Sequence, residues 1–169
     1  MSHHQQESGP SGPRLVLPLI DAEHVAAVLD GRRLPSWAHD YPTPGDLEIA
    51  EMLRDGLPPA AEAAFGIRHV VERATGELVG GIGFFGPPVD GRLEIGYGIV
   101  PSRQRRGYAT EAVLAMLAFA ATLPGVTSVS GDAEPANVAS VRVLQKSGMS
   151  FLGSHGSFVR YQAVVGSPG

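Results

Sequence analysis

No cysteine occurs among the 169 residues of this chain. Its absence excludes disulfide frameworks, zinc sites made of thiolates, iron–sulfur clusters and thiol nucleophiles, so only His, carboxylate and hydroxyl groups remain as reactive side chains. Positive charge is also scarce, since 13 Lys and Arg are outnumbered by 17 Asp and Glu and the net charge is −4. A broad surface for nucleic acid is therefore not expected.

Long apolar runs are missing as well. The most apolar helical stretch covers residues 112–121, far short of the roughly 20 residues that span a bilayer. The N-terminus is polar and shows no targeting segment, so we expect a cytoplasmic protein that does not bind membranes. Residues 1–13 predict a flexible N-terminal tail, and residues 14–169 predict one domain, because a chain of this length forms a single core.

Strand-like and helix-like periods alternate along the chain, which is typical of an α/β domain. We expect helices at about 21–29, 46–53, 107–122 and 137–146. We expect strands at about 14–20, 65–73, 78–86, 93–100 and 127–134, and a final hairpin at 150–153 and 157–165. Asp21, Asp46 and Asn137 are the predicted N-caps, and the Pro- and Gly-rich loop at 31–46 has a length that is often functional.

The segment from Gly81 to Gly86 matches the G-x-G-x-x-G string of dinucleotide-binding proteins. That fingerprint needs a helix directly after its glycines, and Pro87 and Pro88 follow here instead. We therefore interpret these glycines as part of a crowded strand.

A more specific pattern is the segment IVPSRQRRGYATEAV at 99–113. A strand ends at Pro101, a short basic loop containing Arg103 follows, and Gly107 opens an amphipathic helix. The unpaired N–H groups of the first helical turn and the helix dipole favour an anion, and a glycine lets the backbone approach a phosphate closely. A solvated basic loop before a core helix is the alternative interpretation.

A second pattern joins the end of a strand to the start of a helix at residues 134–140. Asn137 is a good N-cap, and Ser140 lies one turn further along. Capping alone would explain Asn137. Its functional interpretation depends on the order of strand, anion loop, helix, strand, capped helix and Gly148.

Together the two patterns resemble the GNAT superfamily of acyl-CoA-dependent N-acyltransferases, and more narrowly its ribosomal-protein N-acetyltransferase-like branch. Residues 104–109 (QRRGYA) fit the family's [QR]-x-x-G-x-[GA] loop for the coenzyme A pyrophosphate. Residues 94–99 (EIGYGI) resemble the strand before that loop, and residues 137–149 resemble the later N-x-x-S…L-x-K-x-G-[FM] segment. The resemblance implies a single α/β domain with a mixed, mostly antiparallel central sheet of about six to seven strands, splayed in the middle and flanked by about four helices.

The resemblance also implies acetyl-CoA as cosubstrate and no metal. The residues expected to bind the coenzyme are Ile99, Val100, Gln104, Arg105, Arg106, Gly107, Tyr108, Ala109, Thr110, Asn137 and Lys146. Many relatives carry a tyrosine near the thioester sulfur as general acid, but this chain has Leu144 there. In the branch resembled, a serine at the position of Ser140 is a candidate replacement, or it binds coenzyme or helps to cap its helix.

Transfer from a thioester needs a neutral amine, and an amine like that of lysine is mostly protonated at pH 7 because its pKa is about 10.4. A base is therefore required, and Glu94 is the first candidate because its strand should lead to the thioester. Asp132 and Glu134 are rivals, and each carboxylate has a purely structural alternative. A backbone N–H near Ile99 or Val100 is expected to meet the oxyanion.

The glycines on both sides of Tyr97 are compatible with a β-bulge that would open the splay. Residues of the early loop and the central strand are expected to line the acceptor pocket: Trp37, His39, Asp40, Tyr41 and Tyr97. Trp37 and Tyr41 have an alternative role, which is to fix the loop to the core. The isolated His24, His69 and His155 have no partners at metal-ligand spacing.

These features predict an acetyltransferase that moves an acetyl group from acetyl-CoA to a primary amine by direct attack, without a covalent enzyme intermediate. The acceptor is a small amine or a peptide or protein N-terminus, and a homodimer is a reasonable default. A non-catalytic acyl-CoA-binding module is the main alternative, supported by the missing tyrosine at position 144. A phosphate- or nucleotide-binding protein is a weaker one.

Overall fold

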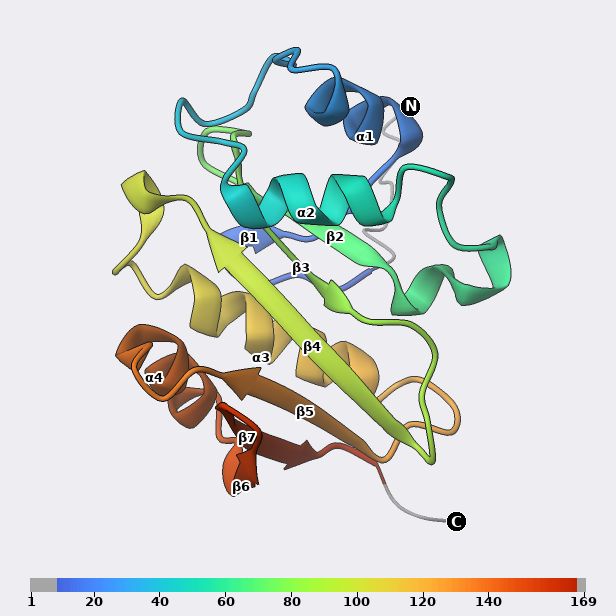
Figure 1. Cartoon of the computed structure of the whole chain (residues 1–169), viewed down its shortest axis with the longest axis vertical. Helices are drawn as coiled ribbons and strands as arrows, with labels where there is room; N and C mark the ends of the chain where they lie inside the picture. Colours follow the sequence, from blue (N-terminus) through green and yellow to red (C-terminus); the bar gives the residue numbers. More distant parts are fainter. Residues whose placement is uncertain (1–8, 167–169) are drawn as a thin grey trace, which may run out of the picture.

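Seven strands form one mixed sheet in the order β1-β2-β3-β4-β5-β7-β6 (Figure 1). The strands are β1 (Leu15–Val16), β2 (Ile67–Glu72), β3 (Leu78–Phe84), β4 (Arg92–Ile99), β5 (Ser128–Ala133), β6 (Ser150–His155) and β7 (Phe158–Val164). Every neighbouring pair is antiparallel except β4 and β5, which are parallel. The computed structural model describes residues 9–166, so residues 1–8 of the predicted tail lie outside the described part.

Four α-helices cover the two faces of the sheet: α1 (Ala22–Leu29), α2 (Pro44–Met52), α3 (Tyr108–Ala120) and α4 (Val138–Lys146). Short 3₁₀ helices occupy Ala60–Phe65 and Pro101–Arg103. α2 lies in front of the sheet with α1, and α3 lies behind it (Figure 1). The predicted α/β class, mixed sheet and helix number are confirmed. Between residues 9 and 166, no helix has the length and apolar character needed to cross a membrane.

The core lies mainly between the sheet and α3. Alternate side chains of the central strands point to that face and are fully buried, among them Val70, Ile82 and Leu93. They join Val113 and Met116, which the helical spacing predicts on the inner face of α3. This core holds α3 under β3 and β4, so the start of α3 has a fixed position relative to the end of β4.

The start of α2 differs from the prediction. Thr43, not Asp46, is the N-cap, and Asp46 occupies the third helical position. Thr43 and Asp46 form a reciprocal capping box, in which the Asp46 N–H donates to Thr43 Oγ1 at 3.3 Å and the Thr43 N–H donates to Asp46 Oδ2 at 2.8 Å. Pro44 suits the first helical position because its fixed φ is helical and its missing N–H is not needed there.

Residues 9–13 also differ from the prediction of a flexible tail. Pro10 is buried, Ser11 forms an isolated bridge with Val16, and the Gly12 N–H donates to Leu15 O at 2.9 Å. The chain therefore turns back along β1 before the first strand begins.

The sheet is splayed between β4 and β5, as predicted. The parallel pairing runs only from Arg92↔Ser128 to Ile95↔Gly131, while β4 stays paired with β3 up to Ile99. The predicted bulge around Tyr97 is wrong, because the β3–β4 register is continuous along this segment. Each strand instead follows its own antiparallel partner, β3 or β7, and the twist of the sheet separates them (Figure 1).

Candidate functional site

The gap between β4 and β5 exposes backbone donors of β4. The Val100 N–H donates to Val79 O at 2.9 Å, so the even-numbered residues of β4 direct their backbone groups toward β3. By the alternation of a strand, the N–H groups of Tyr97 and Ile99 point to the other side, where pairing with β5 has already ended. Of the two predicted oxyanion donors, Ile99 is therefore available and Val100 is not.

The predicted anion loop lies at the end of β4, beside this gap. Gln104 Nε2 donates to Ile99 O at 2.9 Å and ties the loop to the strand. Gly107 is the N-cap of α3 with φ of +79°, and the first hydrogen bond of the helix runs from the Glu111 N–H to Gly107 O at 3.0 Å. The N–H groups of residues 108–110 consequently have no acceptor within the helix and are free to bind an anion.

A clamp from the first strand region holds this loop in place. The Arg14 backbone N–H and Nε donate to the Glu111 carboxylate at 2.9 and 2.8 Å, and Arg14 Nη1 donates to Arg106 O at 2.8 Å. The Arg14 guanidinium also lies 4.6 Å from the centre of the Tyr108 ring. The backbone path of the loop is therefore fixed before any ligand arrives.

Tyr108 contributes to the candidate site through its backbone only. Its side chain is buried and its hydroxyl donates to Glu72, beneath the loop. This hydrogen bond raises the pKa of Tyr108 and lowers the pKa of Glu72. Ala109 and Thr110 are half-buried in the first turn, whereas Arg105 and Arg106 are exposed and extend the positive charge of the loop into solvent.

The start of α4 lies across the gap from β4. Asn137 caps the helix by accepting from the Ser140 N–H at 3.2 Å, and Ser140 O accepts from the Tyr97 hydroxyl at 3.1 Å. Leu144, at the position of the usual acid, is fully buried, and a Cβ placed on Gly131 would lie 2.8 Å from its Cδ2. Lys146 is exposed in the last turn. An aliphatic side chain thus fills the place of the tyrosine.

The candidate bases have different surroundings. Asp132 accepts two hydrogen bonds from Arg160, at 2.8 and 2.9 Å, and these lower the pKa of Asp132. The Glu94 side chain is 50% exposed, with Arg160 Nη2 3.8 Å from its Oε1. Glu134 is exposed at the end of β5. Asp132 is therefore occupied by a structural ion pair, and Glu94 is more open to a ligand.

The early loop residues divide into three groups. Trp37 and Tyr41 are buried, and the Tyr41 hydroxyl lies 2.7 Å from His24 Nε2, so both fix the loop to the core. Asp40 accepts from the Ser102 N–H and Oγ at 2.7 and 2.8 Å; burial raises the pKa of Asp40, but these hydrogen bonds outweigh it and lower the pKa. His39 is 80% exposed. Asp40 thus connects the early loop to the 3₁₀ helix before the anion loop.

Tyr97 does not join these loop residues. Side chains alternate along a strand, so Tyr97 lies on the opposite face of β4 from Glu94, and its hydroxyl reaches α4. Burial raises the pKa of Tyr97 to about 12. Tyr97 also borders the cavity described next, so its place at the acceptor pocket stays a prediction.

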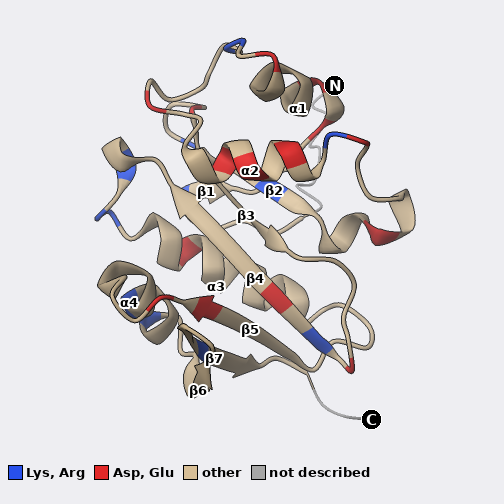
Figure 2. Cartoon of the chain, viewed as in Figure 1, with Lys and Arg blue, Asp and Glu red and all other residues tan. Residues whose placement is uncertain are grey.

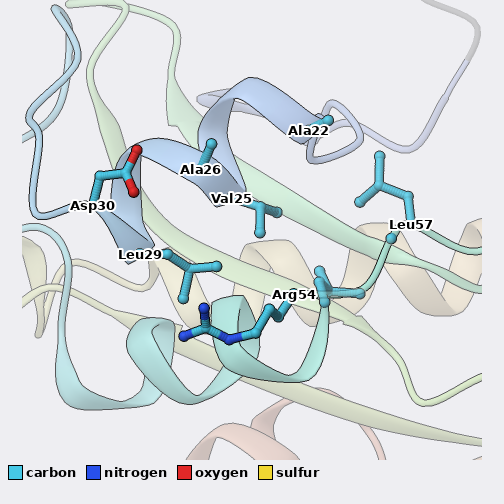
Figure 3. Close-up of a pocket in the computed structure, with 9 residues that line it drawn as sticks. Ala22, Val25, Ala26, Leu29, Asp30, Arg54 and Leu57 are labelled. Atoms are coloured by element: carbon cyan, nitrogen blue, oxygen red, sulfur yellow. The ribbon is translucent and has the colours of Figure 1, made fainter.

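A cavity of about 300 Å³ lies between α2 and strands β2, β3 and β4. Its walls include Tyr41, Asp46 and His69, and its floor includes Gly81 and Gly98. Sequence patterns predict Asp46 only as a helix cap, because no local signal connects the start of α2 with the strands under it. A second cavity, of about 280 Å³, lies between α1 and the end of α2, and none of its lining residues belongs to a strand (Figure 3). Only the first cavity borders β4 and the gap.

His24 and His69, which are distant in sequence, contact each other beside this cavity with ring centroids 4.3 Å apart. Burial lowers the pKa of both, that of His69 to about 4. Within the described residues, no three His, Asp or Glu side chains come together in a way that could hold a metal ion. The pair therefore forms an uncharged wall at neutral pH.

The chain is similar in sequence to known acetyltransferases. Residues 14–150 match the acetyltransferase (GNAT) domain family. The uncharacterized N-acetyltransferase YjdG of Bacillus subtilis (strain 168) is 34% identical over 89 residues, and the match spans 52% of this chain and 52% of that protein, about half the length of each.

Solved structures show the same fold. A GNAT-family acetyltransferase from Bacillus anthracis superimposes with a TM-score of 0.66 at 18% identity, covering 92% of this chain and 97% of that one. The ribosomal alpha-N-protein acetyltransferase RimL, in complex with coenzyme A, superimposes with a TM-score of 0.62 at 17% identity, covering 92% and 97%.

Proposed function

Because the chain belongs to the acetyltransferase (GNAT) domain family, we propose that it transfers an acetyl group from acetyl-CoA to a primary amine. One observation carries this proposal: the free N-terminus of α3 lies at the end of β4, directly beside the gap between β4 and β5. If the pyrophosphate of acetyl-CoA binds at the helix start, the extended arm that carries the thioester can enter the gap. The thioester would then meet the unpaired N–H groups of β4.

The coenzyme-binding role of the loop is supported by its charge and backbone. RimL, which shares the fold, binds coenzyme A. In this chain the pyrophosphate would accept from the N–H groups of residues 108–110, next to Gly107, Arg105 and Arg106. Ile99 at the end of β4 and Asn137 and Lys146 on α4 complete the proposed coenzyme surface.

The chemistry follows from the proposed positions. The neutral amine attacks the thioester carbonyl, and the Ile99 N–H donates to the oxyanion that forms. Glu94, directly or through a water molecule, accepts the proton that the amine loses. The carbon–sulfur bond then breaks, and the leaving thiolate takes a proton from solvent or from the Ser140 hydroxyl. A free thiol has a pKa of about 8.5, so assistance at sulfur matters less than loss of the amine proton.

A non-catalytic acyl-CoA-binding module is the second candidate, and the buried Leu144 is the observation that favours it. Free-thiol release decides between the two. The protein is incubated with acetyl-CoA and a panel of primary amines that includes small amines and peptides with free N-termini. We expect amine-dependent thiol release and an acetylated amine by mass spectrometry. Tight acetyl-CoA binding in calorimetry without thiol release for any amine would favour the binding module.

A further inference from the structure

The floor of the cavity under α2 is made of paired glycines. Gly81 pairs with Gly98, and two residues further along β3 Gly83 pairs with Gly96, where the Phe85 ring covers the floor. A Cβ placed on Gly98 would meet no atom within 4 Å, so the space above it is open. A slender aliphatic chain can therefore lie across the pair of Gly98 and Gly81, starting beside the gap where the thioester is proposed to bind.

Asp46 places an unpaired carboxylate oxygen over this floor. Its Oδ2 accepts from the Thr43 N–H and Oγ1 at 2.8 and 2.7 Å, which uses that oxygen in the capping box. Its Oδ1 faces the sheet, 3.5 Å from where a Cβ on Gly81 would lie. Among residues 9–166, no side chain forms an ion pair with Asp46, and burial raises the pKa of this carboxyl.

The other ionisable groups around the cavity leave this charge uncompensated. His24 and His69 are neutral at pH 7 because burial lowers the pKa of each. The Arg68 guanidinium points away, donating to Leu17 O at 3.1 Å and lying 5.0 Å from the centre of the Phe119 ring. Glu48 adds a second carboxylate at the rim, and Figure 2 shows the acidic residues along α2. The cavity is therefore shaped and charged for a cation.

The position of Asp46 decides which cation it is. Gly81 lies under Asp46 and is one inter-strand spacing, about 4.8 Å, from Gly98. Gly98 in turn lies between Tyr97 and Ile99, whose N–H groups face the gap. The amine that attacks the thioester must be uncharged. An ion pair with Asp46 would stabilise only an amine that stays protonated, so the attacking amine is not the group that Asp46 binds. A second ammonium group, a few carbons away from the reacting amine, fits Oδ1.

We propose that Asp46 binds a second ammonium group of the acceptor, so that the preferred acceptors are short aliphatic diamines or polyamines rather than monoamines. This inference rests on the proposed function, since it assigns the acceptor of the same site. A charged hydrogen bond contributes about 1.5 to 3 kcal/mol, which corresponds to about ten- to hundredfold in specificity.

The test compares diaminobutane with butylamine, which lacks only the second amine. The wild-type protein is expected to show a kcat/KM at least about tenfold higher for diaminobutane. In Asp46→Asn, which keeps an oxygen for the Thr43 cap, this preference should fall to near one, mainly through KM for the diamine. Glu51→Gln removes the same charge from the same helix outside the cavity and should keep the preference.

Binding is measured separately by calorimetry of diaminobutane with the protein alone. Wild-type binding that is lost in Asp46→Asn and in the cavity-filling Gly98→Val supports the inference even if no acetyl transfer is detected, in which case only the proposed function fails. Equal kcat/KM values for the two amines in the wild type, or an unchanged preference in Asp46→Asn, would overturn it. The inference would also be overturned if Asp46→Asn lowered kcat/KM for lysine-containing peptides but not for diamines.

Discussion

Position 144 determines which groups can assist the leaving sulfur. Leu144 is fully buried and packs against Gly131, so no acid reaches the gap from that turn of α4. The Tyr97 hydroxyl is already donated to Ser140 O, and burial raises the pKa of Tyr97 to about 12. The Ser140 hydroxyl, in the first turn of α4, is therefore the remaining candidate donor near the proposed thioester.

Removing the proposed base should cost more than removing the proposed acid. A positioned base contributes about 10²- to 10⁴-fold in rate, so Glu94→Gln should lower kcat at pH 7 by a factor of that order with acetyl-CoA affinity nearly unchanged. Ser140→Ala should slow turnover less, because a thiolate is already a moderate leaving group. Steady-state kinetics on one accepted amine measure both.

Glu134→Gln, which removes an exposed carboxylate at the end of β5, is the matched control and should keep most activity. A defect of Ser140→Ala larger than that of Glu94→Gln contradicts the ranking. Nearly full activity of Glu94→Gln moves the role of base to another carboxylate or to water.

Local signals predict most of the elements. Asp21 and Asn137 cap the helices expected of them, Gly107 starts α3, and the hairpin of β2 and β3 forms around its turn, because caps, turns and periodicity act within a few residues. The Asp46 cap was predicted wrongly because Thr43, a competing cap three residues earlier, forms the reciprocal box with Asp46 itself. Two adjacent capping signals cannot be ranked without their geometry.

The anion loop depends on one left-handed residue. At φ of +79°, any side chain on Gly107 is strained, and it would also narrow the approach to the helix N-terminus. Gly107→Val should therefore weaken acetyl-CoA binding by at least about tenfold, as measured by calorimetry, because the pyrophosphate loses close contact with the backbone.

Gly125 provides the control because it has the same φ of +79° and no atom within 4 Å of an added Cβ. It lies in the turn between α3 and β5, away from the loop. Gly125→Val should lose stability through the same backbone strain and keep acetyl-CoA affinity. Equal affinity in folded Gly107→Val and wild type would show that the coenzyme site is assigned to the wrong loop.

The whole sheet separates the two proposed ligands. Coenzyme groups would lie along the starts of α3 and α4, and the acceptor would lie under α2 on the opposite face, so that the two meet only at the gap. The splay could be expected only from family resemblance, because it results from the pairing of β5 with β7, far apart in sequence. The cavity likewise combines residues of α1, α2 and three strands that no local pattern connects.

The buried histidine pair beside this cavity makes the stability of the fold depend on pH. Burial, with His24 nearby, lowers the pKa of His69 to about 4, and Asp21 opposes this only in part. An unfolded histidine titrates near pH 6.5. Between about pH 6.5 and about pH 4, the unfolded chain therefore binds a proton that the folded chain does not, so the free energy of unfolding decreases as the pH falls through this range.

His69→Gln should flatten this part of the stability profile. The wild type is expected to lose on the order of 3 kcal/mol from His69 between neutral pH and pH 4, with a further contribution from His24. Urea unfolding at several pH values measures the slope, which is independent of any constant packing defect in the variant. His39→Gln removes an exposed histidine and should leave the slope unchanged. An identical slope in His69→Gln and wild type would show that the buried pair binds protons equally in the folded and unfolded states, and that the acid loss of stability comes from elsewhere.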